Sequence, residues 1–115
     1  MTLVSENINH SFEGAGALYV HVPFCPKVCH YCDFAVLKAG EKHHEAWWEL
    51  VQIELETKFP LREGGPYSWD TIYFGGGTPS LLSVSLWGRI LQYFHQRFDL
   101  KRLREMTIEV NPETL

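Results

Sequence analysis

Three cysteines, Cys25, Cys29 and Cys32, stand within eight residues of one another, and the chain has no others. A closed structural zinc site, or an iron–sulfur cluster held wholly by protein, takes four protein ligands. Three thiolates at this spacing can hold three corners of a cubane cluster and leave the fourth iron open. An open iron can bind a small molecule, so the spacing indicates reactive chemistry rather than a structural cross-link.

Other uses of these thiols fit less well. A disulfide suits an odd number of cysteines poorly and requires an oxidising compartment, and residues 1–16 contain no apolar stretch typical of a signal peptide. A zinc site could recruit His21 or His30 as its fourth ligand, although zinc motifs usually consist of two separated pairs. We therefore favour a cluster, with a zinc-binding structural module as the alternative.

Composition limits the class of protein. The 115 residues are 45% hydrophobic and 14% aromatic, which suits one small globular domain. The formal net charge is −4 and no basic stripe is present, so nucleic acid is not an expected partner. No apolar run approaches the roughly 20 residues of a transmembrane helix. We expect a reducing, cytoplasmic setting for a thiolate cluster.

Three predicted strands alternate with two predicted helices. Residues 17–24 alternate in polarity, with aliphatic side chains on one face and Tyr19 and His21 on the other. Residues 71–74 and 106–110 are the other strands, and residues 1–16 are interpreted as a flexible leader without a packing role. Helices are predicted over residues 41–59 and from Ser83 or Ser85 onward, with apolar residues at i, i+4 spacing.

This order implies an α/β fold, β-α-β-α-β, with parallel strands joined by right-handed crossovers. Each strand then runs into an unusual segment: the cysteine loop, the glycine loop at residues 75–79, and Glu109. Carboxyl ends of parallel strands meet at one edge, where ligands bind in such folds. The glycine loop lacks the pattern of a nucleotide-binding loop, so we expect it to bring backbone groups close to a ligand, with a plain turn as the alternative. His43, His44 and His95 are expected on the surface, away from this edge.

With these motifs in place, the chain resembles the start of a radical S-adenosylmethionine (SAM) enzyme. It is most similar to the oxygen-independent coproporphyrinogen III oxidase group. The resemblance covers residues 17–115 and is carried by four segments: residues 19–25 (Tyr-Val-His-Val-Pro-Phe-Cys), 31–34 (Tyr-Cys-Asp-Phe), 72–80 (Ile-Tyr-Phe-Gly-Gly-Gly-Thr-Pro-Ser) and 109–112 (Glu-Val-Asn-Pro).

The resemblance implies a fold and a set of cofactor contacts. The fold would be the N-terminal portion of a partial (β/α)₆ TIM-like barrel, and we expect a fragment that lacks the later strands and a C-terminal domain. The three cysteines would hold a 4Fe–4S cluster whose open iron binds SAM, with SAM cleavage in the full-length protein. Further SAM contacts would come from these residues: Tyr19, Gly76, Gly77, Thr78 and Glu109.

The resemblance also bears on the branch of the group. Coproporphyrinogen dehydrogenases carry a further cysteine two positions after the third, and Phe34 occupies that position here. The Asp33-Phe34 ending is similar to the HemW branch, which implies a heme chaperone that passes its cargo to an acceptor protein, with peripheral membrane association through that acceptor. Oxidative decarboxylation of coproporphyrinogen III is the alternative. The sequence identifies neither the electron donor nor the acceptor.

Overall fold

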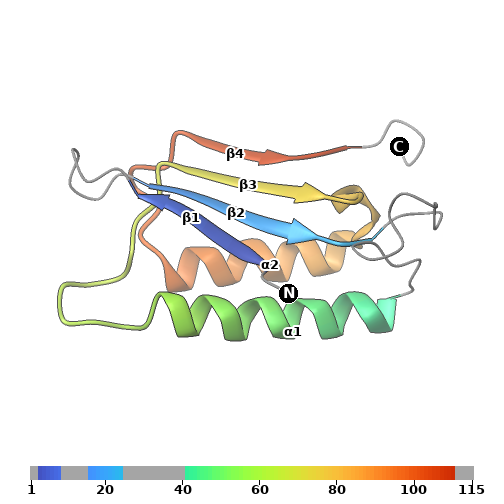
Figure 1. Ribbon diagram of the computed structural model, residues 1–115, viewed down its shortest axis with the longest axis horizontal. Helices are drawn as coiled ribbons and strands as arrows, with labels where there is room; N and C mark the ends of the chain where they lie inside the picture. Colours follow the sequence, from blue (N-terminus) through green and yellow to red (C-terminus); the bar gives the residue numbers. More distant parts are fainter. Residues whose placement is uncertain (1–2, 9–15, 25–40, 111–115) are drawn as a thin grey trace.

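A computed structural model describes residues 3–8, 16–24 and 41–110. These residues form one sheet, with two α-helices packed against one of its faces (Figure 1). The elements, in chain order, are β1 (Val4–Ile8), β2 (Gly16–Val22), α1 (Glu41–Lys58), β3 (Thr71–Gly76), a 3-10 turn (Pro79–Leu81), α2 (Val84–Arg97) and β4 (Glu105–Ile108). Neither described helix has the length and apolar character that spanning a bilayer requires.

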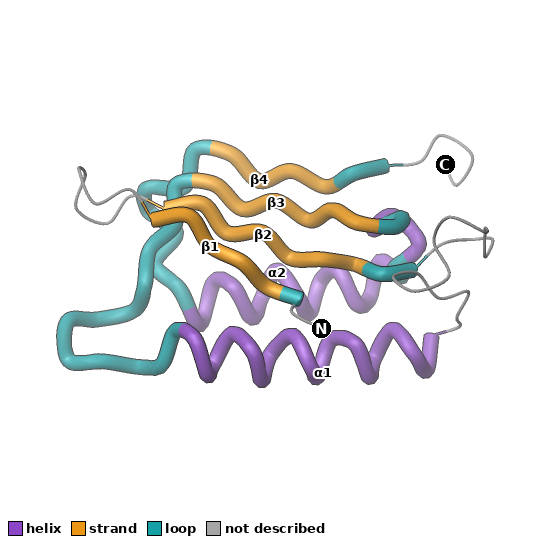
Figure 2. Tube along the Cα trace, viewed as in Figure 1, coloured by secondary structure: helices purple, strands orange, loops and turns teal. Residues whose placement is uncertain are grey.

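The sheet has the order β1-β2-β3-β4, and its last three strands are parallel. Leu18 of β2 pairs with Ile72 of β3, which in turn pairs with Met106 of β4. Each parallel connection passes through a helix, and both helices lie on the same side of the sheet (Figure 2). The predicted α/β class and the β-α-β-α-β order are confirmed, and the arrangement corresponds to the first units of a partial TIM-like barrel.

The core lies between the helices and the sheet. In β2 the burial alternates residue by residue, because successive strand side chains point to opposite faces. The helices contribute apolar residues at i, i+4 spacing, as predicted. Ser83 is the N-cap of α2, and its hydroxyl accepts a hydrogen bond from the Leu86 N–H at 3.1 Å. The largest fully buried side chains are Trp69, Phe24, Phe74, Phe94, Leu18, Leu55, Ile72, Leu86 and Ile90.

The interpretation of residues 1–16 as a leader without a packing role is wrong for residues 3–8. Residues 4–8 form β1, which pairs antiparallel with β2, so that Val4 lies opposite Val20. Leu3 and Val4 are buried in the core. The apolar pattern of this strand is too short to be recognised alone, and its position depends on contacts with a helix about fifty residues away in the sequence.

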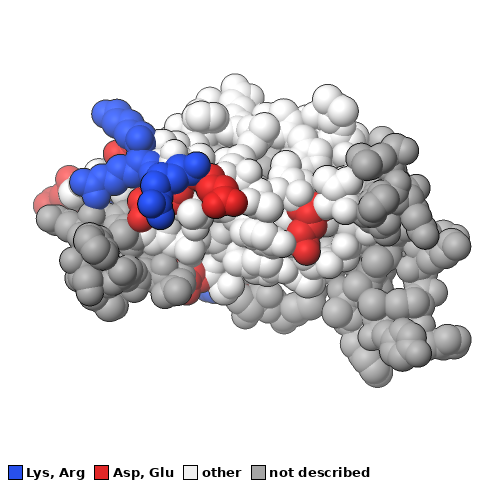
Figure 3. Space-filling model, turned by 90° about the horizontal axis from the view of Figure 1, so that it is seen from above, with Lys and Arg blue, Asp and Glu red and all other residues white. Residues whose placement is uncertain are grey.

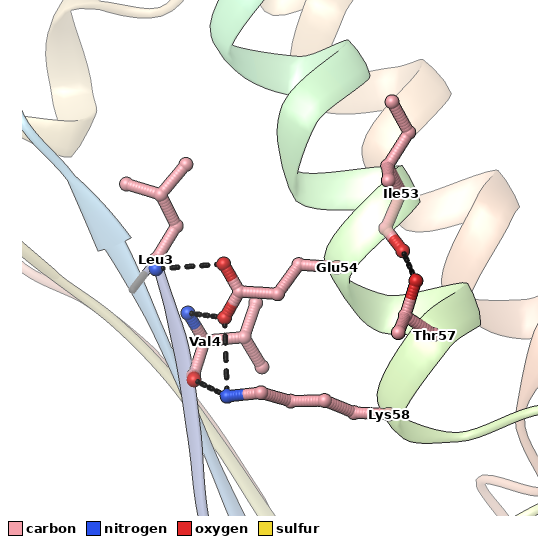
Figure 4. A network of polar contacts seen from close by, with 6 residues as sticks. All are labelled: Leu3, Val4, Ile53, Glu54, Thr57 and Lys58. Carbon is pink, nitrogen blue, oxygen red and sulfur yellow. Dashed lines mark hydrogen bonds and ion pairs between the residues drawn. The ribbon is translucent and has the colours of Figure 1, made fainter. Parts of the chain in front are cut away.

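Two charged side chains of α1 hold β1 in place (Figure 4). The Glu54 carboxylate accepts hydrogen bonds from the N–H groups of Leu3 at 2.9 Å and Val4 at 2.7 Å. The Lys58 ammonium donates to the Val4 carbonyl and lies 3.2 Å from Glu54. Burial alone would raise the pKa of Glu54, but the two N–H groups and Lys58 outweigh it and lower that pKa.

We expect Glu54→Ala to reduce the free energy of unfolding by about 2 kcal/mol at neutral pH, because two N–H groups lose a charged acceptor. A lowered folded-state pKa contributes stability above the unfolded pKa, and that contribution is lost as the pH falls through the folded value. The difference between Glu54→Ala and wild type, measured by urea unfolding, should therefore shrink below about pH 4. Glu49→Ala, at an exposed glutamate of the same helix, is the control. Equal losses of stability in the two variants would show that Glu54 does not hold β1 in place.

Candidate functional site

The carboxyl ends of β2, β3 and β4 lie at the same edge of the sheet, toward the right in Figure 1. The face opposite the helices is open along these strands among the described residues. Tyr19, Tyr73 and Thr107 occupy neighbouring positions on it, since their Cα atoms are in register across the three strands. The predicted convergence of the strand ends is thus present in the structure.

Tyr19 and His21 share the open face of β2, as the alternation predicts. The Tyr19 hydroxyl and His21 Nδ1 are 3.1 Å apart, within hydrogen-bonding distance. The Trp47 indole N–H donates to the His21 carbonyl at 2.9 Å and so ties this part of β2 to α1. Desolvation raises the pKa of Tyr19, and the nearby negative charge of Glu109 adds to the shift. The phenol therefore keeps its proton at neutral pH.

Gly75 lies where three side chains converge. A Cβ atom placed on it would stand 2.5 Å from Glu109 Oε1, 2.7 Å from Tyr73 Cε1 and 3.0 Å from Tyr19 Cε2. Real Cβ atoms do not approach other atoms this closely, so a side chain at this position would displace at least one of the three groups. The missing side chain is what lets residues from β2, β3 and the end of β4 meet.

The next two glycines meet the end of β2. Gly76 has a φ of +113°, a conformation that favours glycine. The Gly77 N–H donates to the Val22 carbonyl at 2.8 Å, and the Thr78 N–H donates to the Phe24 carbonyl at 2.5 Å. A Cβ on Gly77 would overlap the Phe24 carbonyl oxygen. Phe24 directly precedes Cys25, so the glycine loop fixes the backbone from which the cysteine loop departs.

Glu109 follows β4, which ends at Ile108, so the prediction that it lies within the strand is wrong by one residue. Its side chain is exposed, and its Oε1 accepts a hydrogen bond from the Gly76 N–H at 2.9 Å. The Glu109 N–H donates to the Phe74 carbonyl at 3.0 Å, which holds the residue against β3. Glu109 forms no ion pair with a described residue. The carboxylate is thus held in place and its charge is not neutralised within that part of the chain.

Two residues near this edge were missed or misplaced. His44 was expected on the surface, but it is only 6% exposed and its ring lies 4.5 Å from that of Phe24, centroid to centroid. Its i, i+3 spacing to Trp47 could have revealed this. Tyr73 was not singled out, although it stands between the buried Ile72 and Phe74 and must therefore face the site. His43 and His95 are exposed, as predicted.

Comparisons with known proteins find relatives along most of the chain. The chain is 36% identical over 112 residues to the mitochondrial radical S-adenosyl methionine domain-containing protein 1 of Danio rerio, covering 96% of this chain and 24% of that protein. It is 38% identical to the heme chaperone HemW of Lactococcus lactis (84% and 24% covered). It is 29% identical to the oxygen-independent coproporphyrinogen III oxidase of Escherichia coli (86% and 21% covered).

The chain belongs to the radical SAM superfamily, in the group of these proteins. It spans between 21% and 24% of the length of these three relatives. No family model and no solved structure matches it. Membership of the superfamily implies a 4Fe–4S cluster and SAM.

The donor set and the shape of the edge fit these two cofactors. Cys25, Cys29 and Cys32 lie outside the described residues, and within the described ranges no group of three or more His, Cys, Asp or Glu side chains could hold a metal ion. Their spacing still supplies three thiolates directly after a strand that the glycine loop fixes. An exposed carboxylate beside backbone without side chains suits the cationic, amino-acid part of SAM.

A groove of about 300 Å³ on the helices is a separate feature. It contains none of the predicted site residues and is crossed by an ion pair between Arg89 and Glu45. The Tyr93 hydroxyl at its border donates to Glu56 at 3.5 Å. Desolvation and the charge of Glu56 raise the pKa of Tyr93 to about 12. The groove's lining is mostly polar: Glu45, Trp48, Glu49, Gln52, Arg89, Gln92, Tyr93 and Gln96.

We expect Gly77→Ala to lower the free energy of unfolding by about 1–3 kcal/mol, because its methyl group would overlap the Phe24 backbone and force β2 and β3 apart. Gly64→Ala is the matched control, since a Cβ there meets nothing within 4 Å and should change stability by less than about 0.5 kcal/mol. Chemical denaturation of both variants gives the comparison. Equal stability of Gly77→Ala and wild type would show that the close approach is not required.

Proposed function

We propose that this chain builds the cofactor site of a HemW-type heme chaperone, in which a 4Fe–4S cluster and SAM are bound at the carboxyl edge of the sheet. The observation that carries the proposal is the meeting of Tyr19, the glycine loop and Glu109 at the edge where the cysteine loop begins. These features come from three different strands, and a purely structural loop would not need an exposed carboxylate held beside a glycine backbone.

In this proposal Cys25, Cys29 and Cys32 hold three irons of the cluster. When bound, the cluster would offer SAM an open coordination position and, after reduction by an external electron donor, the one electron that cleavage of SAM consumes. The glycine loop contributes backbone groups at Gly76, Gly77 and Thr78 that surround the methionine part of SAM. A reducing, cytoplasmic setting suits the proposal, because the thiols must stay unpaired to bind iron.

Glu109 and Tyr19 would orient the SAM molecule. The Glu109 carboxylate has one oxygen engaged by the Gly76 N–H and is exposed, so it can accept a further hydrogen bond from the ammonium group of SAM. The Tyr19 phenol, whose pKa is raised, stays protonated and neutral beside this carboxylate. The residues thus offer one negative charge to a ligand that carries positive charge.

Heme delivery is favoured over porphyrinogen oxidation by two features. Phe34 stands where the resemblance to the dehydrogenases requires a further cysteine. The identity is also higher to the Lactococcus lactis HemW than to the Escherichia coli oxidase. We therefore propose heme as cargo and a heme-requiring protein as acceptor, with coproporphyrinogen III oxidation as the second candidate function.

Replacement of Glu109 by Gln should weaken SAM binding to the reconstituted full chain about tenfold, because a charged partner of the ammonium group becomes neutral. Isothermal titration without oxygen measures the dissociation constant. Glu105→Gln is the matched control, since Glu105 is an exposed glutamate at the start of β4, the strand that Glu109 follows. A similar loss in both variants would indicate a general charge effect and would count against Glu109 as a ligand.

Iron, sulfide and heme analyses test the rest of the proposal. Anaerobic reconstitution should give four irons and four sulfides per chain, and replacing any of Cys25, Cys29 or Cys32 by Ala should abolish this loading. Zinc without labile sulfide would instead support the structural zinc module. The full-length protein should bind heme and leave coproporphyrinogen III unchanged; porphyrinogen turnover without heme binding would favour the oxidase.

A further inference from the structure

Tyr73 lies at the centre of the open face. It is the third residue of β3, and its neighbours Ile72 and Phe74 are buried against the helices, so its own side chain points to the opposite side. Its Cα is in register with Tyr19 on β2 and with Thr107 on β4. The side chain is 38% exposed, which leaves it accessible to a ligand at this edge.

Tyr73 lies beside two side chains that the proposed function places around SAM, Tyr19 of β2 and Glu109 just after β4. Its ring stacks on that of Tyr19, with centroids 5.9 Å apart and planes inclined by 19°. The Glu109 carboxylate lies beside the same ring, since a Cβ placed on Gly75 would stand 2.5 Å from Glu109 Oε1 and 2.7 Å from Tyr73 Cε1. Both contacts exist because Gly75, two residues on, has no side chain to separate the three groups.

Glu109 needs such a second donor to keep one orientation. It follows the end of β4, is exposed, and its side chain has three rotatable bonds that a single hydrogen bond from the Gly76 N–H would not all fix. A hydrogen bond from the Tyr73 hydroxyl would supply that second anchor. Desolvation and the Glu109 carboxylate raise the pKa of Tyr73, so the phenol stays protonated at neutral pH and can donate.

We propose that Tyr73 is a positioning residue that fixes the Glu109 carboxylate and the Tyr19 ring for SAM. The inference rests on the proposed function, because it assigns Tyr73 no contact of its own with the cofactor. It adds to that function by naming the side chain, Tyr73 of β3, that orients Glu109. The contribution is divided between the hydroxyl, which holds Glu109, and the ring, which supports Tyr19.

The first test uses the full chain without cofactors. Tyr73→Phe keeps the stacked ring but removes the hydroxyl, so Glu109 should move more freely and the Gly76 N–H should exchange with deuterium about fivefold faster. Tyr93→Phe is the matched control, because it removes a different tyrosine hydroxyl that donates to a glutamate, in the helical layer. Unchanged Gly76 exchange in Tyr73→Phe would overturn the proposal.

The second test measures SAM affinity of the anaerobically reconstituted full chain. Tyr73→Phe should raise the dissociation constant about fivefold, and Tyr93→Phe should leave it unchanged. In a Glu109→Gln background the Tyr73→Phe replacement should have little further effect, because the two residues act through one contact. Additive losses would indicate a merely structural role and would overturn the proposal. Tyr73→Leu removes the ring as well and should weaken binding further.

The outcomes separate the two proposals. If wild type, loaded with its cluster, does not bind SAM, the proposed function fails and the role of Tyr73 falls with it. If wild type binds SAM and Tyr73→Phe binds it equally well, only the role of Tyr73 is overturned. Thermal unfolding of each variant shows whether a loss of affinity comes with a loss of fold, and the exchange of Gly76 reports on Glu109 without any ligand.

Discussion

The site depends on the close approach of two backbones at the ends of β2 and β3. Gly77 lies so near the Phe24 carbonyl that no side chain fits between them, and the hydrogen bonds from Gly77 and Thr78 fix this distance. The cysteine loop starts at the next residue, so its origin is set by the glycine loop and not by its own sequence. The same lack of side chains at Gly75 brings Glu109 over the end of β3. The absence of a Cβ atom at Gly75 and at Gly77 therefore positions both Glu109 and the start of the cysteine loop.

The two edges of the sheet are treated differently. On one side of the parallel strands, β2 pairs with β1. Glu54 and Lys58 of α1 bond to backbone N–H and carbonyl groups at the start of β1. At the other side β4 is an edge strand of the described sheet. An unpaired strand edge can accept a further strand, and side chains that bond to its backbone groups compete with such pairing. Glu54 and Lys58 do this at the start of β1.

Much of the fold could be predicted because its signals are local. The i, i+4 apolar series of α1 and α2 and the alternation around Tyr19 each occupy one segment, and the order of segments then implies parallel strands. The strand β1 could not be predicted, because Glu54 holds it from a distant helix. The burial of His44 likewise depends on the position of Phe24. For the site, the motifs identified Glu109 as a candidate, but its neighbour Tyr73 became evident only from the fold, which brings both side chains to Gly75.

The open face differs from the helix-covered face in a way that argues for a ligand rather than for a second core. The covered side of β2 and β3 carries aliphatic and aromatic residues that are almost fully buried, whereas the opposite side carries Tyr19, His21, Tyr73 and Gly75. Seen from above, the visible Lys and Arg side chains gather at the end where the parallel strands begin (Figure 3). Hydroxyl, imidazole and carboxylate groups gain little from burial under an apolar layer, because each would need a new hydrogen-bond partner. A polar, cationic ligand supplies such partners, and the Glu109 charge, which no described cation neutralises, remains available to it.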